Sequence, residues 1–371
     1  MSKKTALVLS GGGARGAYQA GVLKGLAEIL PEKKKSPFQI ISGVSAGAIN
    51  TAKLACDIDS FANAVEKLNY LWSQVSTEQV FKTDFLSLNK LSLNMFGKKK
   101  NFDSLLDTSP LEDLLNQNCD FSKIQSHIKN GFIESLIITT NNYNTGSAVS
   151  FIQTTEPDMI WKESRRLALT VQLNAKHIMA SSAIPMLFPP IQIGSEYYGD
   201  GCVRNNTPCS PPIRMGAEKL FVIGVRTQNS SHDTDQPATH EPPSIIRIIN
   251  TLLNAVLLDS VEQDVRRIQR INQFIEDASH GGEVVNKDLK AIPALCISPS
   301  EDIGTLARNH AHHLPRLLRM TLSTFGSLDE ASEIISYLLF DAQFCRKLID
   351  MGYNDAMNSK ETILQFFNGD T

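Results

Sequence analysis

The sequence lacks the features that mark several common classes of protein. Its 371 residues include only six cysteines, and no two of them form a Cys-x-x-Cys pair. We therefore expect free thiols in a reducing compartment rather than a zinc site or a disulfide framework. No apolar run reaches the ~18 residues of a membrane-spanning helix. The run Thr5–Leu9 is also shorter than the ~7-residue core of a signal peptide, which predicts a cytoplasmic protein.

An excess of positive charge is missing as well. The 36 lysines and arginines are balanced by 39 acidic residues, so a nucleic-acid partner is not expected. The first hundred residues do hold 14 basic against 7 acidic residues, which could attract the chain to the surface of an anionic membrane. Lysine runs at 33–35 and 98–100 that simply lie in solvated loops are the simpler interpretation.

What is present is ordinary globular composition, with 42% hydrophobic and 20% charged residues. Apolar runs at Thr5–Leu9 and Phe38–Val44 predict buried strands. Helical spacing of apolar residues predicts helices at Ala17–Leu30 and Ala46–Cys56. Strands that alternate with helices indicate an α/β fold with three layers, in which helices flank a mainly parallel central sheet.

The rest of the chain extends this pattern and ends in a mainly helical segment. We expect a catalytic α/β domain over 1–228, a polar linker over 229–243, and a helical C-terminal extension over 244–371 packed on the core. Further strands are predicted at Phe132–Thr140, Ala148–Thr154, Leu220–Val225 and Ala294–Ser298, and helices at Ala168–Ala180, Ser244–Ala278 and from Leu314 onward.

Two segments allow both a lipid-facing and a structural interpretation. The helix Ser244–Ala278 has an apolar first half and could lie on a membrane surface, but packing on the core is favoured. The loop at 85–101 mixes leucines, Met95 and Phe96 with a lysine run. It could be a flap that contacts lipid, or a surface loop whose leucines pack on the core.

The strongest local motif is Gly43-Val44-Ser45-Ala46-Gly47, between a predicted strand and a predicted helix. A nucleophile on such a sharp turn needs small neighbours two residues away on either side. The turn exposes the hydroxyl at a helix N-terminus, where N–H groups favour developing negative charge. Ser45 is therefore the candidate nucleophile.

A second motif, residues 11–16, also joins a strand to a helix. Consecutive glycines Gly11, Gly12 and Gly13 let backbone N–H groups approach an anion. The string also fits the dinucleotide pattern G-x-G-x-x-G, but the second predicted strand ends without the acidic residue that would bind a ribose. A glycine loop that serves as an oxyanion hole fits better, with Arg15 adding positive charge beside it.

A serine nucleophile needs a base, and the eight histidines offer no obvious partner for Ser45. Asp200 is the better candidate, because Gly199-Asp200-Gly201 follows a strand-like run at Tyr197-Tyr198. Open α/β sheets carry their sites at the carboxyl ends of strands. No cluster of residues has the spacing of metal ligands.

Taken together, the three motifs resemble the patatin-like phospholipases of bacterial type, whose pattern is a glycine loop, G-x-S-x-G and then Asp-Gly in that order. The segments Ala180-Ser-Ser-Ala-Ile-Pro185 and Phe188-Pro189-Pro190 resemble the stretch before Asp-Gly in bacterial members. One residue departs from the pattern, since Cys202 stands where the family commonly has glycine or alanine after Gly201.

The resemblance implies a lipid acyl hydrolase with a Ser–Asp dyad and no cofactor. Ser45 would attack the ester and form an acyl-enzyme, Asp200 would accept the proton, and the loop Gly11–Gly13 with Arg15 would stabilise the oxyanion. The substrate would be a fatty-acyl ester of a lipid or phospholipid. Two alternatives remain open, a non-catalytic lipid-binding or scaffold protein of the same fold and an acyltransferase that uses the same acyl-enzyme.

Overall fold

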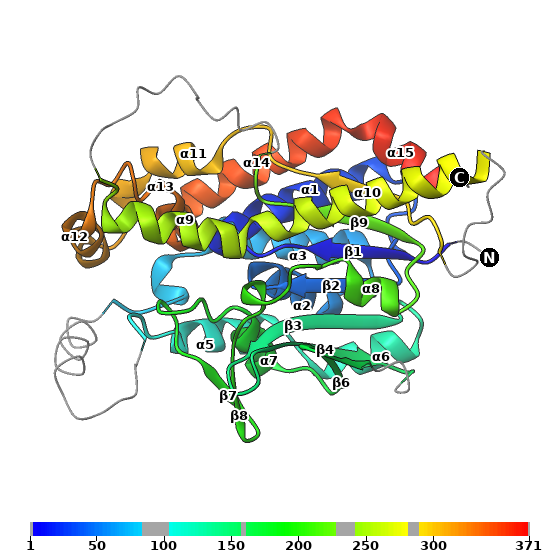
Figure 1. Ribbon diagram of the computed structural model, residues 1–371, viewed down its shortest axis with the longest axis horizontal. Helices are drawn as coiled ribbons and strands as arrows, with labels where there is room; N and C mark the ends of the chain where they lie inside the picture. The colour runs from blue at the N-terminus through cyan, green and yellow to red at the C-terminus, as the bar shows by residue number, and fades with distance from the viewer. Residues whose placement is uncertain (1–2, 84–103, 157–160, 228–241, 281–288, 370–371) are drawn as a thin grey trace.

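A computed structural model describes residues 3–83, 104–156, 161–227, 242–280 and 289–369 of the chain (Figure 1). The strands are β1 (Thr5–Leu9), β2 (Ile40–Val44), β3 (Ser135–Asn142), β4 (Ser147–Thr154), β5 (Lys162–Glu163), β6 (Arg166–Thr170), β7 (Ile191–Ile193), β8 (Glu196–Asp200), β9 (Lys219–Ile223) and β10 (Ala294–Ile297). The helices are α1 (Gly16–Ile29), α2 (Ala46–Cys56), α3 (Phe61–Gln74), α5 (Ser109–Asn118), α6 (Ser122–Lys129), α7 (Ala175–Ser181), α8 (Ser210–Arg214), α9 (Ile245–Leu257), α10 (Asp259–His280), α11 (Ile303–Asn309), α12 (Arg316–Phe325), α13 (Ser332–Leu338), α14 (Ala342–Asn358) and α15 (Lys360–Asn368).

All the described strands belong to one sheet, in the order β10-β9-β1-β2-β3-β4-β6-β5, with β8 paired to β3 and β7 paired to β8. The five strands from β10 to β3 are mutually parallel, while β4 and β8 run antiparallel to β3. Parallel strands are buried on both faces, which is why β1 and β9 are almost continuous apolar runs. The parallel half therefore forms the middle of the molecule.

Side chains of β1 alternate between two hydrophobic clusters, one on each face of the sheet. Leu7 and Leu9 pack with residues of α1, α2 and α14. Ala6 and Val8 pack on the other face, with residues of α8 and α10. The fold is thus a mixed α/β structure with a central sheet between helical layers, as the sequence predicted (Figure 1).

The C-terminal region contributes to both the sheet and its helical cover. β10 adds an edge strand to β9, and α14 packs closely along α1. This approach requires glycine, since a Cβ at Gly352 would lie 2.2 Å from the carbonyl oxygen of Tyr18, and one at Gly21 would lie 2.1 Å from that of Ile349. Side chains would otherwise hold two helices 8–10 Å apart.

Two sequence-based assignments were wrong. The helix predicted over Ala168–Ala180 is the strand β6 followed by α7, because residues 166–170 pair with β4 and Asn174 caps a new helix by accepting the Lys176 amide. The helix predicted over Ser244–Ala278 is two helices, α9 and α10, which separate at Leu258. Neither break contains a glycine or a proline.

The loop 85–101, for which a lipid-contacting flap and a surface loop packed on the core were the alternatives, lies outside the described residues, as does most of the predicted linker, 229–243. Among the helices that the structure describes, none combines the length and the hydrophobicity needed to cross a bilayer.

Candidate active site

Ser45 lies where β2 ends and α2 begins. Its φ of 55° is in the left-handed region, which side chains other than glycine rarely occupy. Such strain persists only where surrounding contacts fix the backbone, and it is common at functional sites. The residue is buried, and its carbonyl accepts the amide of Ala48 at 2.9 Å as α2 starts. The turn therefore holds the Ser45 hydroxyl at the N-terminal end of α2.

The two glycines of the motif permit the close packing of this turn. A Cβ at Gly43 would lie 2.3 Å from the carbonyl oxygen of Gly47, and one at Gly47 would lie 2.3 Å from that of Leu9. Both contacts are with backbone, which cannot swing aside as a flexible side chain could. The requirement inferred for small residues at positions 43 and 47 thus has a direct steric cause.

Ser181, the last residue of α7, and Ser182, which follows it, fix the backbone of the elbow. The Ser45 amide donates to Ser181 Oγ at 3.0 Å, and Ser181 Oγ donates in turn to the carbonyl of Thr139 at 2.6 Å. Ser182 Oγ donates to the Ser45 carbonyl at 3.1 Å. In the sequence, this stretch resembles the family pattern before Asp-Gly, but no pattern predicts a role for Ser181 or Ser182. Their separation of more than 130 residues from Ser45 hides the contact from any local pattern.

The register of the sheet brings Asp200 beside Ser45. Val44 pairs with Thr139 across β2 and β3, and Asp200 pairs with Thr140 across β3 and β8. Because β2 runs parallel and β8 antiparallel to β3, their C-terminal ends meet at adjacent residues of β3, and this brings Asp200 close to Ser45. Gly201 allows this, since a Cβ there would lie 2.2 Å from the carbonyl oxygen of Thr139.

The Asp200 carboxyl group is fully buried, and burial raises its pKa from 3.8 to about 6. Hydrogen bonding from the Ser45 hydroxyl and from Cys202 acts in the opposite direction and lowers this pKa. Oδ1 accepts the Cys202 amide at 2.9 Å, while Oδ2 has no hydrogen bond of regular geometry within the described residues. One carboxylate oxygen is therefore fixed, and the other remains open to a proton.

The glycine loop lies directly over Ser45. A Cβ at Gly11 would lie 2.9 Å from Ser45 Cβ and 2.5 Å from Cys202 Sγ, so only glycine fits. Interaction with the Gly11 amide lowers the pKa of Cys202. The Gly12 amide donates to no oxygen within the described part of the chain, so it is available to a bound oxyanion.

Arg15, which the sequence predicted as a positive charge beside the glycine loop, has its guanidinium group in contact with α13. It forms an ion pair with Glu333, donates to Ser336 Oγ at 2.8 Å, and lies over the ring of Tyr337. The side chain is only 1% exposed, so a solvated loop arginine is excluded. Its charge is matched by Glu333, and its direct effect is to tie the glycine loop to α13.

The contacts that the structure gives for histidines involve neither Ser45 nor Asp200. His127 bonds the carbonyl of Ala55, His177 caps α7, and His313 pairs with Asp341. His232 and His240 lie outside the described residues. The described residues contain no group of three or more His, Cys, Asp or Glu side chains arranged to hold a metal.

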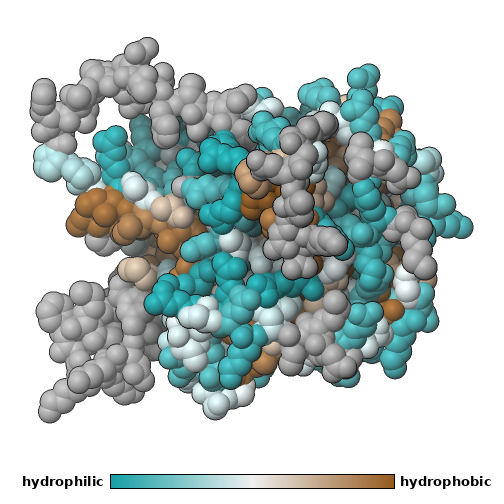
Figure 2. All heavy atoms as spheres, turned by 45° about the vertical axis from the view of Figure 1, so that its right-hand side comes forward, coloured by the Kyte–Doolittle hydropathy of each residue, from teal (hydrophilic) through white to brown (hydrophobic). Residues whose placement is uncertain are grey.

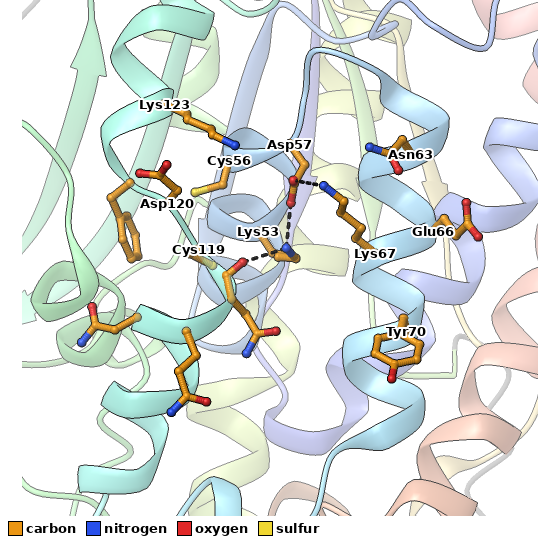
Figure 3. Close-up of a pocket in the computed structure, with 14 residues that line it drawn as sticks. Lys53, Cys56, Asp57, Asn63, Glu66, Lys67, Tyr70, Cys119, Asp120 and Lys123 are labelled. Carbon is orange, nitrogen blue, oxygen red and sulfur yellow. Dashed lines mark hydrogen bonds and ion pairs between the residues drawn. The ribbon is translucent and has the colours of Figure 1, made fainter.

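A separate polar pocket of about 740 Å³ lies at the other end of α2 (Figure 3). Cys56 ends α2 there, roughly 16 Å along the helix from Ser45. Lys53 and Lys67 both pair with Asp57, and Lys53 also donates to the carbonyl of Asn118. With Glu66, Asp120 and Lys123, the lining holds three lysines and three carboxylates, so its formal charges balance. The pocket contains neither Ser45 nor Asp200.

Comparison with known proteins places this site in context. The cGAMP-activated phospholipase of Pseudomonas aeruginosa is 26% identical over 202 residues, which cover 54% of this chain and 53% of that protein. The probable lipid hydrolase 463L of invertebrate iridescent virus 6 is 26% identical over 288 residues, covering 74% and 87%. Patatin-like phospholipase domain-containing protein 7 of Rattus norvegicus is 25% identical over 232 residues, covering 62% and 14%.

The chain therefore spans about half of the Pseudomonas protein and a seventh of the rat protein. Among solved structures, human GIVD cytosolic phospholipase A2 aligns over 99% of this chain and 60% of its own, with a TM-score of 0.45 and 12% identity. A family model described as patatin-like phospholipase matches residues 7–213, more than half of the chain. On that match, the chain belongs to the patatin-like phospholipase family.

Proposed function

We propose that the chain is a serine acyl hydrolase that cleaves fatty-acyl esters of lipids or phospholipids with a Ser45–Asp200 dyad. One observation carries this proposal: a strained serine at a helix N-terminus lies beside a buried carboxylate that has one oxygen free. Family membership supports the lipid substrate class.

In the first half-reaction, Ser45 Oγ attacks the ester carbonyl while Asp200 Oδ2 accepts the hydroxyl proton. The carbonyl oxygen becomes an oxyanion, which the Gly12 amide and the N-terminal amides of α2 stabilise. The tetrahedral intermediate collapses, the bond to the alcohol oxygen breaks, and Asp200 returns the proton to the departing alcohol. An acyl group remains on Ser45.

In the second half-reaction, water replaces the alcohol and Asp200 accepts one of its protons. The hydroxide oxygen attacks the acyl carbonyl, and collapse of the intermediate breaks the bond to Ser45 Oγ. Asp200 gives its proton back to that oxygen, and the fatty acid leaves. If an acceptor alcohol took the place of water, the same steps would make the protein an acyltransferase.

An aspartate is a weak base for an alcohol, and two features reduce this difficulty. Burial raises the pKa of Asp200 to about 6, much closer to neutral pH than the pKa of a solvated carboxylate. Oxyanion stabilisation adds about 3–4 kcal/mol per donor. The raised pKa also has a consequence for pH, because kcat/KM should fall as the pH drops below about 6 and Asp200 becomes protonated.

The test compares the wild type with Ser45→Ala and Asp200→Asn on a soluble nitrophenyl butyrate and on phospholipid vesicles. Both variants should lose at least about a thousandfold in kcat/KM, because each removes a group that acts in the transition state. An alkyl fluorophosphonate should add its mass to the wild type at Ser45 and leave Ser45→Ala unmodified. Ser126→Ala, at an exposed serine on α6, is the control and should behave as wild type.

Three outcomes would contradict the proposal. Equal turnover by Ser45→Ala would exclude the nucleophile. A wild type that binds lipid but neither hydrolyses esters nor reacts with the fluorophosphonate would indicate a non-catalytic scaffold. Product that is a new ester rather than a free fatty acid would identify an acyltransferase.

A further inference from the structure

Helix α9 has an apolar face that the described part of the chain leaves uncovered. Ile246, Asn250 and Leu257 are buried on its inner side. Ile245, Ile248 and Leu252 are 58%, 48% and 62% exposed. These three residues are spaced by three and four positions, so they form a stripe along one side of the helix.

The neighbouring helix α12 extends this apolar surface. It packs against α9 and carries Met320, which is 56% exposed. We call Ile245, Ile248, Leu252 and Met320 the α9–α12 face. Figure 2 shows hydrophobic residues that project from the end of the molecule where these two helices lie. Large apolar side chains grouped on a surface in this way mark an interaction site.

The charges on the two helices have one sign. Arg247 on α9, with Arg316 and Arg319 on α12, is accompanied by no aspartate or glutamate on either helix. The carboxylates between α12 and α13 already have partners, since Asp329 pairs with Arg308 and Glu330 accepts a hydrogen bond from Ser244. An apolar stripe with arginines beside it complements a surface that is apolar inside and anionic at its boundary.

The position of the α9–α12 face links it to the candidate active site. Helix α9 packs against the turn Gly201–Val203, which directly follows Asp200. Asn250 fixes the helix by donating to the carbonyl of Glu330 and accepting the amide of Ile334. The first half of α9 and α12 also lie at the left end of Figure 1, toward which β1 runs from the N-terminus. Ser45 follows β2, which is parallel to β1, so the face and the nucleophile lie at the same end of the sheet.

The polar segment that precedes α9 is poorly suited to cover the face. Residues 228–241 include only Pro237 and Ala238 as apolar residues, and their acidic side chains are Asp233, Asp235 and Glu241. A lipid surface is the occupant that satisfies both the apolar stripe and the arginines.

We propose that the α9–α12 face is the surface by which this protein docks on an anionic phospholipid bilayer, with Ile245, Ile248, Leu252 and Met320 in the acyl boundary and the arginines at the phosphates. This inference rests on the proposed function, because the docked face sets the Ser45 end of the sheet against its substrate. The membrane-surface interpretation of 244–278 then applies to α9, while α10 packs on the core through Val261 and Val265.

The experiment measures co-sedimentation of the full chain with vesicles of phosphatidylcholine and phosphatidylserine in a 7:3 ratio (about 30% anionic lipid). Ile248→Ser with Leu252→Ser should weaken the partition coefficient at least about tenfold. Arg316→Ser with Arg319→Ser should weaken it on these vesicles and change little on pure phosphatidylcholine. The matched control is Ile271→Ser with Phe274→Ser on α10, whose side chains are 44% and 64% exposed. It should bind as the wild type does.

The same variants are also compared with the wild type in ester turnover and in thermal stability. The Ile248/Leu252 variant should lose turnover of vesicle phospholipid in proportion to binding, keep turnover of a soluble ester within about twofold, and keep the wild-type Tm. Unchanged vesicle binding would overturn the proposal. A clear fall in Tm would overturn it too, because the face would then be covered by the chain itself, for example by residues 84–103.

Two further outcomes separate the alternatives. Wild-type self-association that the Ile248/Leu252 variant abolishes would overturn the proposal and assign the face to contact between copies. If the wild type binds vesicles through this face but hydrolyses neither substrate, the proposed function fails while the docking surface stands.

Discussion

At the scale of single residues, Asp200 carries a conflict between stability and reactivity. A carboxylate buried without a cationic partner costs folding free energy, and the pKa raised to about 6 is the measure of that cost. The same raised pKa makes Asp200 a better proton acceptor for Ser45. The proposed reaction therefore requires a group that weakens the fold at neutral pH.

Asp200→Asn should consequently inactivate the protein and stabilise it. The folded wild type favours protonated Asp200, so the contribution of this carboxyl group to wild-type stability is fully present below about pH 3.8 and is lost as the pH rises through about 6. The asparagine removes the buried charge. At pH 7.5 the variant should be more stable by up to about 3 kcal/mol, and the difference should vanish near pH 4.

Denaturant unfolding at the two pH values measures this difference. Asp59→Asn, at an exposed aspartate, is the control and should match the wild type at both. A less stable Asp200→Asn at pH 7.5 would mean that the Asp200 carboxylate is compensated by a partner that the described contacts do not include.

At the scale of elements, local patterns identified what short segments encode. The apolar run Thr5–Leu9 and the small-residue segment Ala46–Cys56 have the predicted type and bounds. Lysines precede the first run and Ser10 with three glycines follows it, while the elbow fixes the start of the second segment. β6 was missed because a five-residue strand with two leucines resembles the start of an apolar helix. Its identity depends on pairing with β4, which is a tertiary contact.

At the candidate site, too, local patterns predict some features, while others depend on tertiary contacts. Ser45, Asp200 and the glycines were proposed from short motifs, and the backbone turns that these motifs encode bring them together in the structure. The contacts of Arg15 were not predicted, because its partners lie on α13, more than 300 residues away. The direction of a long side chain depends on what packs over it, and no spacing rule reveals that.

The contact between the glycine loop and α13 leads to a prediction about Glu333. Gly13 has a φ of 57°, and a Cβ there would lie 2.2 Å from the carbonyl oxygen of Tyr337, so the loop and α13 fit closely. Glu333→Gln leaves the buried Arg15 charge without its counter-ion. We expect the loop to shift and kcat for the soluble ester to fall about 10- to 100-fold with KM little changed, because oxyanion contacts act in the transition state.

Titration with a fluorophosphonate counts the active sites, so that kcat can be expressed per folded molecule. Arg308→Gln, which breaks the exposed pair with Asp329, is the matched control and should keep kcat. If kcat per titrated site is unchanged in Glu333→Gln, the Arg15–Glu333 pair only stabilises the fold and does not position the loop.

At the scale of the whole molecule, the C-terminal region is built into the sheet and its helical cover. It supplies β10 to the sheet, α14 to the cover of α1, and α13 to the glycine loop. Trp72 of α3 stacks on Phe340, between α13 and α14, at a centroid distance of 6.3 Å. Contacts spread over both faces in this way favour one folding unit rather than a domain with a removable extension.

If the chain is one folding unit, it should unfold in a single thermal transition. Turnover of the soluble ester should then be lost over the same temperatures as the calorimetric unfolding peak. Gly352→Ala should lower that transition by several degrees, because its Cβ would lie 2.2 Å from the Tyr18 carbonyl oxygen and force α14 away from α1. Asn354→Ala, at an exposed position on α14, should leave the transition unchanged. A Gly352→Ala protein that shows an early transition and still hydrolyses the ester above it would mean that α14 unfolds independently. The sheet and its site would then be stable without the C-terminal cover.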